Sequence, residues 1–75
     1  MRTPVYTIYD KVAEEAGPVF QARNDGVAAR AFRILLKDSR QDEHRLYQVG
    51  EFDSEKVMLF TMDAKEILVT KEVTE

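Results

Sequence analysis

The chain has 75 residues, of which 44% are hydrophobic and 33% charged, with a net charge of -3 and no cysteine. This composition is that of a globular protein and excludes a disordered one, and the length suits one α+β domain over residues 1–75. No apolar run is long enough for a signal peptide or a membrane span, so we expect a cytoplasmic protein without membrane contact.

The first 23 residues are predicted to form a β-hairpin. "VYTIY", residues 5–9, combines β-branched and aromatic side chains after Pro4, which is typical of the start of a strand. "KVAEEAG", residues 11–17, interrupts it, and Gly17-Pro18 indicates a turn. "PVFQAR", which begins at Pro18, then predicts a second short strand.

One helix is predicted from residue 24 to about residue 37. Asn24 or Asp25 can cap its first turn by accepting a hydrogen bond from a free backbone N–H. Apolar residues at helical spacing indicate the face toward the core, and they are Ala28, Ala31, Phe32, Leu35 and Leu36. Three basic residues fall on another face, namely Arg30, Arg33 and Lys37.

The second half of the chain predicts another hairpin. Residues 38–44 form a polar loop, and "RLYQVGEFD", residues 45–53, alternates as a strand does, with Leu46 and Gly50 on one side and Tyr47 on the other. Residues 53–56 fit a hairpin turn before the strand "VMLFTM". After Asp63-Ala64, "KEILVTKEV" fits either a fifth short strand or a tail that crosses the sheet.

These elements predict a ββαββ α+β fold, in which a single helix covers one face of a small antiparallel sheet. The aromatic residues outnumber what one small core needs, and they include Tyr6, Tyr9, Phe20, Tyr47, Phe52 and Phe60. Some of them on the uncovered face would make a dimer surface, a ligand surface, or both. Because small cores give limited stability and no disulfide or cysteine-bound zinc can add to it, we expect a homodimer or a higher oligomer.

The residue inventory argues against an enzyme, a metal site or a cofactor site. His44 is the only histidine and has only nearby carboxylates as companions. Ser39 and Ser54 lie in turn contexts without a base that could activate them. Acidic clusters such as Asp42-Glu43 are typical of solvated surface, and the three glycines are too isolated for a phosphate-binding loop.

Charge is unevenly distributed along the chain. Residues 1–20 sum to -1, residues 21–40 to +3 and residues 41–75 to -5. Arginine and lysine one helical turn apart can bridge successive phosphates, and aromatic rings on a sheet can stack on unpaired bases. The simpler alternative is a solvated helix face that pairs with acidic strands, and the residues alone favour that alternative.

Three segments in order resemble the small nonstructural protein of gokushoviruses, which are single-stranded DNA bacteriophages of the Microviridae. They are "YTIYD" with Lys11, "GPVFQARNDGVAARAF" and "LYQVGEFD", and together they span residues 6 to 53. The resemblance implies a DNA-binding phage protein that is made in the host bacterial cytoplasm. Its expected role is in viral DNA replication, in the switch to single-strand synthesis, or in packaging.

The leading hypothesis is therefore a non-enzymatic protein that binds DNA, with single-stranded DNA favoured. The residues expected to meet phosphates are Arg23, Arg30, Arg33, Lys37 and Arg40, and those expected to stack on bases are Tyr9 and Tyr47. The competing hypothesis is a module that contacts a phage or host replication or assembly protein through the sheet face or the acidic C-terminal half. A small enzyme would require a pocket that these residues hardly supply.

Overall fold

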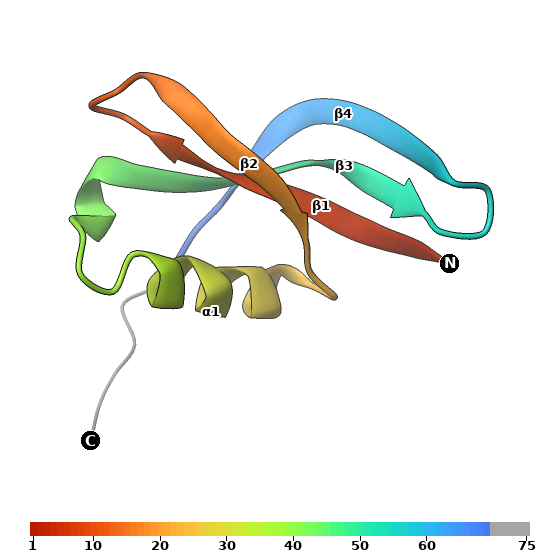
Figure 1. Ribbon diagram of the computed structural model, residues 1–75, viewed down its shortest axis with the longest axis horizontal. Coiled ribbons are helices and arrows are strands. Elements are labelled where there is room, and N and C mark those ends of the chain that lie inside the picture. Colours follow the sequence, from red (N-terminus) through yellow and green to blue (C-terminus); the bar gives the residue numbers. More distant parts are fainter. Residues whose placement is uncertain (70–75) are drawn as a thin grey trace.

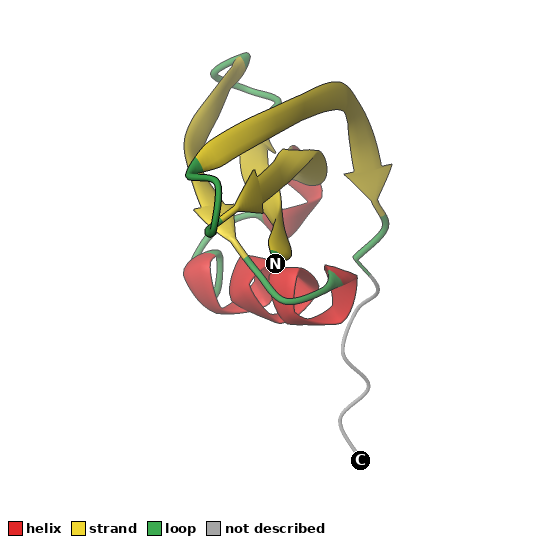
Figure 2. Ribbon diagram, turned by 90° about the vertical axis from the view of Figure 1, so that its right-hand side faces the viewer, coloured by secondary structure: helices red, strands yellow, loops and turns green. Residues whose placement is uncertain are grey.

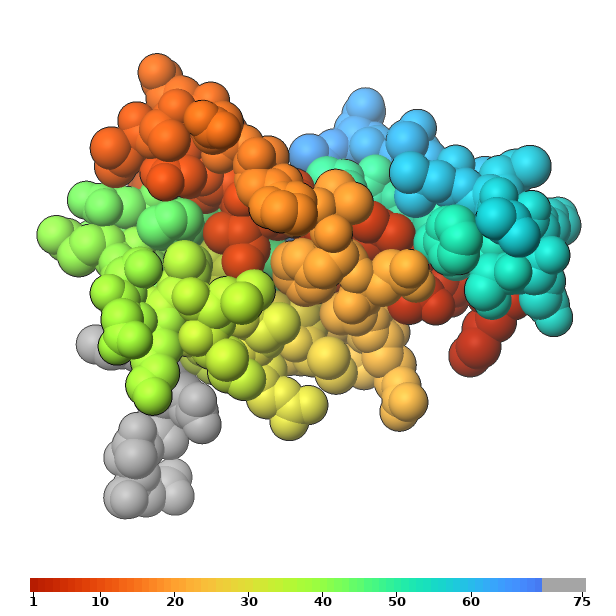
Figure 3. Space-filling model, viewed as in Figure 1, coloured from red at the N-terminus to blue at the C-terminus, as the bar shows by residue number. Residues whose placement is uncertain are grey.

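The computed structural model describes residues 1–69 (Figure 1). Its elements are β1 (Arg2–Asp10), β2 (Glu15–Gln21), α1 (Asp25–Leu35), the 3-10 turn η1 (Gln41–Glu43), β3 (His44–Asp53) and β4 (Met58–Ile67). The four strands form one antiparallel sheet in the order β2-β1-β3-β4. The helix lies below this sheet in Figure 1, and the β3–β4 hairpin projects at one end of the molecule (Figure 3).

The prediction of an α+β fold is wrong in the balance of its elements. Strands take 52% of the described residues and helices 20%, so the protein is mostly a four-stranded sheet that carries one short helix. The strands are longer than predicted because antiparallel pairing extends β1 back to Arg2 and carries β4 on to Ile67. Residues 65–67, where the fifth strand was predicted to begin, are the end of β4, and residues 70–73 lie outside the described residues.

Irregular pairing explains why two expected breaks in the chain are absent. Gly17 and Pro18 do not form a turn but lie inside β2. The pairing is irregular there, because Thr7 of β1 pairs with Val19 and Tyr9 pairs with Ala16. The expected break at Asp63-Ala64 is a bulge, because Gln48 pairs with Lys65 whereas Gly50 pairs with Thr61. Figure 2 shows that β4 bends sharply along its length. A bulge lets a strand turn without ending it.

A second bulge, in the pairing of β1 with β3, interrupts the alternation of side chains along β3. Val5 pairs with Gly50 and its neighbour Tyr6 pairs with Gln48, so Val49 has no partner on β1. Gly50 therefore lies on the opposite face from Gln48, and the prediction that strict alternation continues past Val49 is wrong. At Gly50 the backbone of β4 comes so close that a Cβ atom would collide with the Phe60 carbonyl oxygen.

The helix begins where its cap predicts but turns a different face to the sheet. The Asn24 side chain accepts a hydrogen bond of 2.9 Å from the Val27 backbone N–H. The buried helical positions are Ala28, Ala29 and Phe32, followed by Leu36 directly after the helix. Leu35, predicted to be in the core, is 65% exposed. Apolar residues occur almost all round this helix, so the pattern alone allows more than one choice of buried face.

Tyr6 joins the helix to the sheet. Its ring is buried among Phe32, Leu46 and Ile67 in the core and stacks on Phe20, with 6.0 Å between the ring centroids. Its hydroxyl donates a hydrogen bond of 2.7 Å to Oδ1 of Asp25 in the first turn of α1. Burial raises the pKa of the Tyr6 phenol, and the hydrogen bond to the Asp25 carboxylate and the charge of that group raise it further.

The two hairpin turns have the same pattern of hydrogen bonds. Asp10 ends β1 and its Oδ1 accepts hydrogen bonds from the backbone N–H groups of Val12 and Ala13, at 2.9 and 3.0 Å. Asp53 ends β3 and accepts in the same way from residues 55 and 56, at 3.0 and 3.2 Å. Each turn closes on a residue with positive φ, Glu14 at 60° and Val57 at 51°.

Candidate nucleic-acid interface

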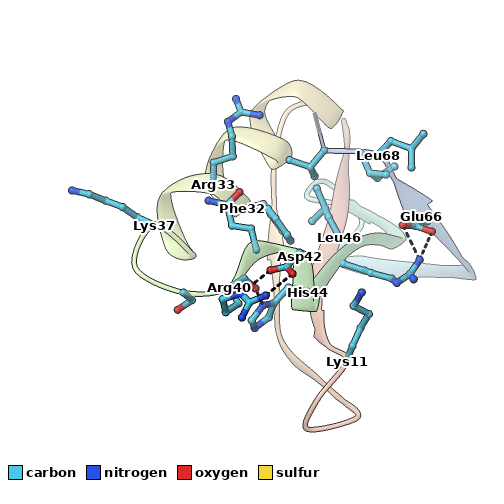
Figure 4. A pocket seen from close by; sticks show the side chains of 15 residues that line it. Lys11, Phe32, Arg33, Lys37, Arg40, Asp42, His44, Leu46, Glu66 and Leu68 are labelled. Carbon is cyan, nitrogen blue, oxygen red and sulfur yellow. Dashed lines mark hydrogen bonds and ion pairs between the residues drawn. The ribbon is translucent and has the colours of Figure 1, made fainter. Parts of the chain in front are cut away.

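A basic groove lies between the C-terminal end of α1, the segment through η1, the start of β3 and the end of β4 (Figure 4). Within residues 1–69 its basic lining side chains are Lys11, Arg33, Lys37, Arg40 and Arg45. Its acidic ones are Asp42 and Glu66, so the lining carries a charge of +3 with His44 neutral. This charge stands out in a chain whose net charge is -3.

Strand pairing brings these residues together from distant parts of the sequence. Asp10 pairs with His44 at the end of the β1–β3 ladder, and the Lys11 backbone N–H donates to the Glu43 carbonyl oxygen at 2.9 Å. Lys11 is thereby placed beside η1. Tyr47 pairs with Glu66, which sets the end of β4 against the start of β3. Lys37 follows the last turn of α1, and Figure 4 shows its side chain extending away from the groove.

Two arginines of the groove already hold carboxylates. Arg40 donates to both oxygens of Asp42, at 3.1 Å from Nε and 2.8 Å from Nη2. This pairing raises the pKa of Arg40 and lowers the pKa of Asp42. Arg45 Nη1 lies 3.2 Å from each carboxylate oxygen of Glu66. Exposed pairs of this kind contribute little to stability, and two oxygens of a phosphate can replace the carboxylate in bidentate contact with a guanidinium.

His44 has a structural role at the floor of the groove. Its Nδ1 lies 2.8 Å from the Arg40 carbonyl oxygen, and its Nε2 lies 3.7 Å from Oδ2 of Asp10. The ring therefore ties the segment before β3 to the end of β1. Within residues 1–69, no group of three or more His, Cys, Asp or Glu side chains is arranged to hold a metal ion. None of the helices in the same range is long and apolar enough to cross a membrane.

The structure divides the predicted binding residues among three places. Arg33, Lys37 and Arg40 line the groove, whereas Arg23 and Arg30 are exposed residues outside its lining. Tyr9 and Tyr47 meet edge to face, 6.3 Å apart, on the sheet face opposite the helix, where Tyr9 pairs with Arg45 and Tyr47 pairs with Glu66. The two rings therefore border the groove at Arg45 and Glu66 but do not line it.

Lys11 and Arg45 are groove residues that the sequence reasoning missed. Both are isolated basic residues next to predicted strands, and only the pairing of β1 with β3 brings them beside the basic end of the helix. Knowledge of the strand order was the missing signal, because the sequence separation of these residues gives no hint of proximity.

The uncovered face of the sheet has a shallow apolar hollow. Its lining residues are Thr7, Tyr9, Ala16, Tyr47, Val49 and Ala64. The expectation that some aromatic residues lie on the uncovered face is thus confirmed for Tyr9 and Tyr47. The Thr7 hydroxyl, at the edge of this hollow, donates to the Gly17 carbonyl oxygen at 2.9 Å.

Fold and groove together define a small, predominantly β protein with one concentrated basic surface. The model of the family called Phage ORF5 protein matches residues 3–73, and the chain belongs to this family. The expected bacteriophage origin is therefore confirmed at the level of the protein family. Neither a curated protein nor a solved structure matches the chain.

Proposed function

We propose that the chain is a non-enzymatic phage protein that binds DNA in the basic groove, with single-stranded DNA favoured. The observation that carries the proposal is the gathering of five basic side chains around one groove in an acidic protein. The phage family supports a role in viral genome replication, single-strand synthesis or packaging in the host bacterial cytoplasm. The resemblance to the gokushovirus nonstructural protein supports the same role.

The shape of the site favours single-stranded over duplex DNA. Reading a duplex usually requires a helix or a two-stranded ribbon that projects into the major groove. In this protein α1 is packed onto the sheet, and its exposed side carries the apolar residues Ile34 and Leu35, each 65% exposed, beside Arg30. A flexible single strand can instead follow a concave groove with its phosphates on the rim.

The same contacts support a binding role over a catalytic one. The one histidine ring is occupied by the Arg40 carbonyl and lies beside Asp10. Ser39 donates its backbone N–H to Leu36 and Ser54 donates to Met1, so both serines belong to turns. His44, the one histidine, contacts Arg40 and Asp10 and not a serine, so neither serine has an imidazole base to activate it for nucleophilic attack.

Fluorescence anisotropy with labelled single- and double-stranded oligonucleotides across a salt series tests this function. We expect affinity for the single strand to fall steeply with salt, and Lys11→Gln and Lys37→Gln each to reduce the salt slope by about 0.7. Lys56→Gln, at the far end of the molecule, removes the same charge and serves as the control. No binding at low salt, or an equal effect of Lys56→Gln, would contradict the proposal.

A second function is supported by the exposed apolar surface. Ile34 and Leu35 on α1 and the hollow beside Tyr9 and Tyr47 are surfaces suited to contact a phage or host replication or assembly protein. Under this alternative the protein would show negligible DNA affinity, and a tagged copy would recover a protein partner from infected cells. Substitution of Leu35 by Ser would then abolish the recovery, whereas Lys11→Gln would not.

A further inference from the structure

The sheet has two outer strands, β2 and β4, and each presents a row of backbone N–H and C=O groups without a strand partner. Such an edge can pair with another chain unless it is interrupted by proline, a bulge or charged residues. The two edges of this protein differ in this respect.

The β2 edge is interrupted. Pro18 has no N–H to donate, and the pairing of β1 with β2 shifts at Gly17 and Pro18. Glu15 adds a charge at the beginning of the strand. Because these are the devices by which native edge strands avoid pairing, β2 is a poor template for another strand.

The first half of β4 has none of these devices. Residues 58–62, "MLFTM", contain no charge, proline or glycine, and the pairing with β3 is regular from Met58 to Thr61. Three of its side chains are substantially exposed, Met58 at 47%, Leu59 at 53% and Met62 at 43%. Val57, just before the strand, is exposed and has a φ of 51°, which is costly for a β-branched residue.

We propose that residues 58–62 of β4 pair in antiparallel fashion with the same segment of a second copy of this chain. The twofold axis passes at Phe60, so Met58 lies opposite Met62 of the second copy and Leu59 lies opposite its Thr61. The two sheets become one sheet of eight strands. This contact depends on the strand order and not on the proposed DNA binding.

Symmetry and charge both favour a second copy as the partner. A twofold dimer requires a surface that complements itself, and an uncharged antiparallel segment meets this condition without like-charge repulsion. Charges begin only beyond the segment, and their order is complementary: the register that centres on Phe60 brings Glu55, which lies 3.1 Å from its own N-terminal ammonium, level with Lys65 of the second copy. Lys56 comes near Asp63 of that copy. Neither Lys56 nor Asp63 is in an ion pair within residues 1–69.

The bend in β4 keeps this contact separate from the basic groove. Pairing with β3 becomes irregular after Thr61, and the strand reaches the groove only at Glu66. The paired segment therefore lies on the projecting β3–β4 hairpin (Figure 1), away from the groove lining at the C-terminal end of α1 and the start of β3.

Sedimentation of the full chain over concentrations from about 5 to 500 µM tests the contact, because mass action makes a weak dimer depend on concentration. We expect a monomer–dimer equilibrium whose dissociation constant rises at least about tenfold in Met58→Lys/Met62→Lys, since edge lysines block strand pairing. Val19→Lys, on the exposed β2 edge, is the matched control and should leave the equilibrium unchanged. Circular dichroism confirms that each variant is folded.

A charge exchange tests the register without altering the paired segment. Lys56→Glu alone and Asp63→Lys alone should each weaken the dimer by placing like charges near each other, and the double variant Lys56→Glu/Asp63→Lys should restore it. A wild-type chain that stays monomeric throughout the concentration range overturns the proposal. A dimer that withstands Met58→Lys/Met62→Lys, or that only Val19→Lys disrupts, overturns it as well.

Discussion

The two hairpins of the sheet have the same turn but different outer strands. Asp10 and Asp53 each accept two backbone hydrogen bonds, and each turn closes on a residue with positive φ. Beyond the turn, β2 is broken by the irregularity at Pro18, whereas β4 begins with a regular, uncharged segment. The turn thus determines the geometry of each hairpin, whereas the outer strand of the hairpin determines whether another chain can pair with it.

The largest expected difference between the hairpins concerns their glycines. Gly50→Ala should lower the free energy of unfolding by about 3 kcal/mol, because the new Cβ collides with the Phe60 carbonyl and the β4 backbone must move. Gly17→Ala in the other hairpin should be almost neutral, since its Cβ would lie 3.6 Å from the Ile8 carbonyl oxygen. Urea denaturation of the two variants measures the difference, and equal losses would contradict it.

Tyr6 connects the first hairpin to the helix by a hydrogen bond as well as by packing. Tyr6→Phe should cost about 1.5 kcal/mol, because the hydrogen bond to Asp25 is lost. The pKa of Tyr6 is raised in the folded state, so its contribution is complete below about pH 10, the usual pKa of the unfolded phenol, and is lost as pH rises above that value.

Thermal unfolding from pH 8 to 11 checks this dependence. The wild-type protein should lose stability above about pH 10 more steeply than Tyr6→Phe does. Tyr47→Phe, on the uncovered face, is the control and should retain the wild-type slope. An identical slope in all three proteins would show that the phenol of Tyr6 titrates as freely as in the unfolded chain.

Substitution by glycine at the positive-φ residue of each turn should have the opposite effect and make the protein more stable. Val57→Gly should raise the free energy of unfolding by about 1 kcal/mol, because glycine adopts this backbone conformation without strain. Glu14→Gly should gain less, since glutamate is not β-branched. Urea denaturation of both variants ranks the two gains, and a loss at Val57 would show that its side chain stabilises the turn.

The smallest expected effect separates the two turn aspartates at low pH. Backbone hydrogen bonds, chiefly from Ala13 to Asp10 and from Lys56 to Asp53, hold the pKa of each carboxyl below its usual value. Their stabilising contribution is present above about pH 4, the usual pKa of the unfolded group, and disappears as pH falls below it.

Asparagine at either position should therefore flatten the loss of stability below pH 4. Asp53→Asn should have the larger effect on Tm at neutral pH, because Asp53 is buried and lies 3.7 Å from the N-terminal ammonium. Melting curves from pH 3 to 7 measure both changes. A larger effect from Asp10→Asn would indicate that burial of the turn carboxylate contributes nothing.

Local features of the fold could be predicted from the sequence, and those that depend on packing could not. Asn24 as a helix cap and the turn after Asp53 follow from residues close together in the chain. The buried face of α1 was predicted wrongly at Leu35, because apolar residues lie on several sides of this helix and only contact with Tyr6 and Leu46 decides among them.

The same limit applies to the candidate site. Arg33, Lys37 and Arg40 are neighbours in sequence and all border the groove, although the Lys37 side chain extends away from it, whereas Lys11 and Arg45 reach it only through strand pairing. The tyrosines were assigned to the same surface as the arginines, and they border the groove only through Arg45 and Glu66, their cross-strand partners. Which side of the sheet the helix covers is a property of the packed structure and cannot be obtained from alternation.

The placement of the three tyrosines also makes the protein its own optical reporter. The chain has no tryptophan, so tyrosine emission is not masked by a stronger fluorophore. Tyr6 donates its hydroxyl to a carboxylate, an arrangement that quenches phenol emission, which leaves Tyr9 and Tyr47 as the principal emitters. A molecule that binds the uncovered face, or the groove beside Arg45, the cross-strand partner of Tyr9, will change this signal without any label.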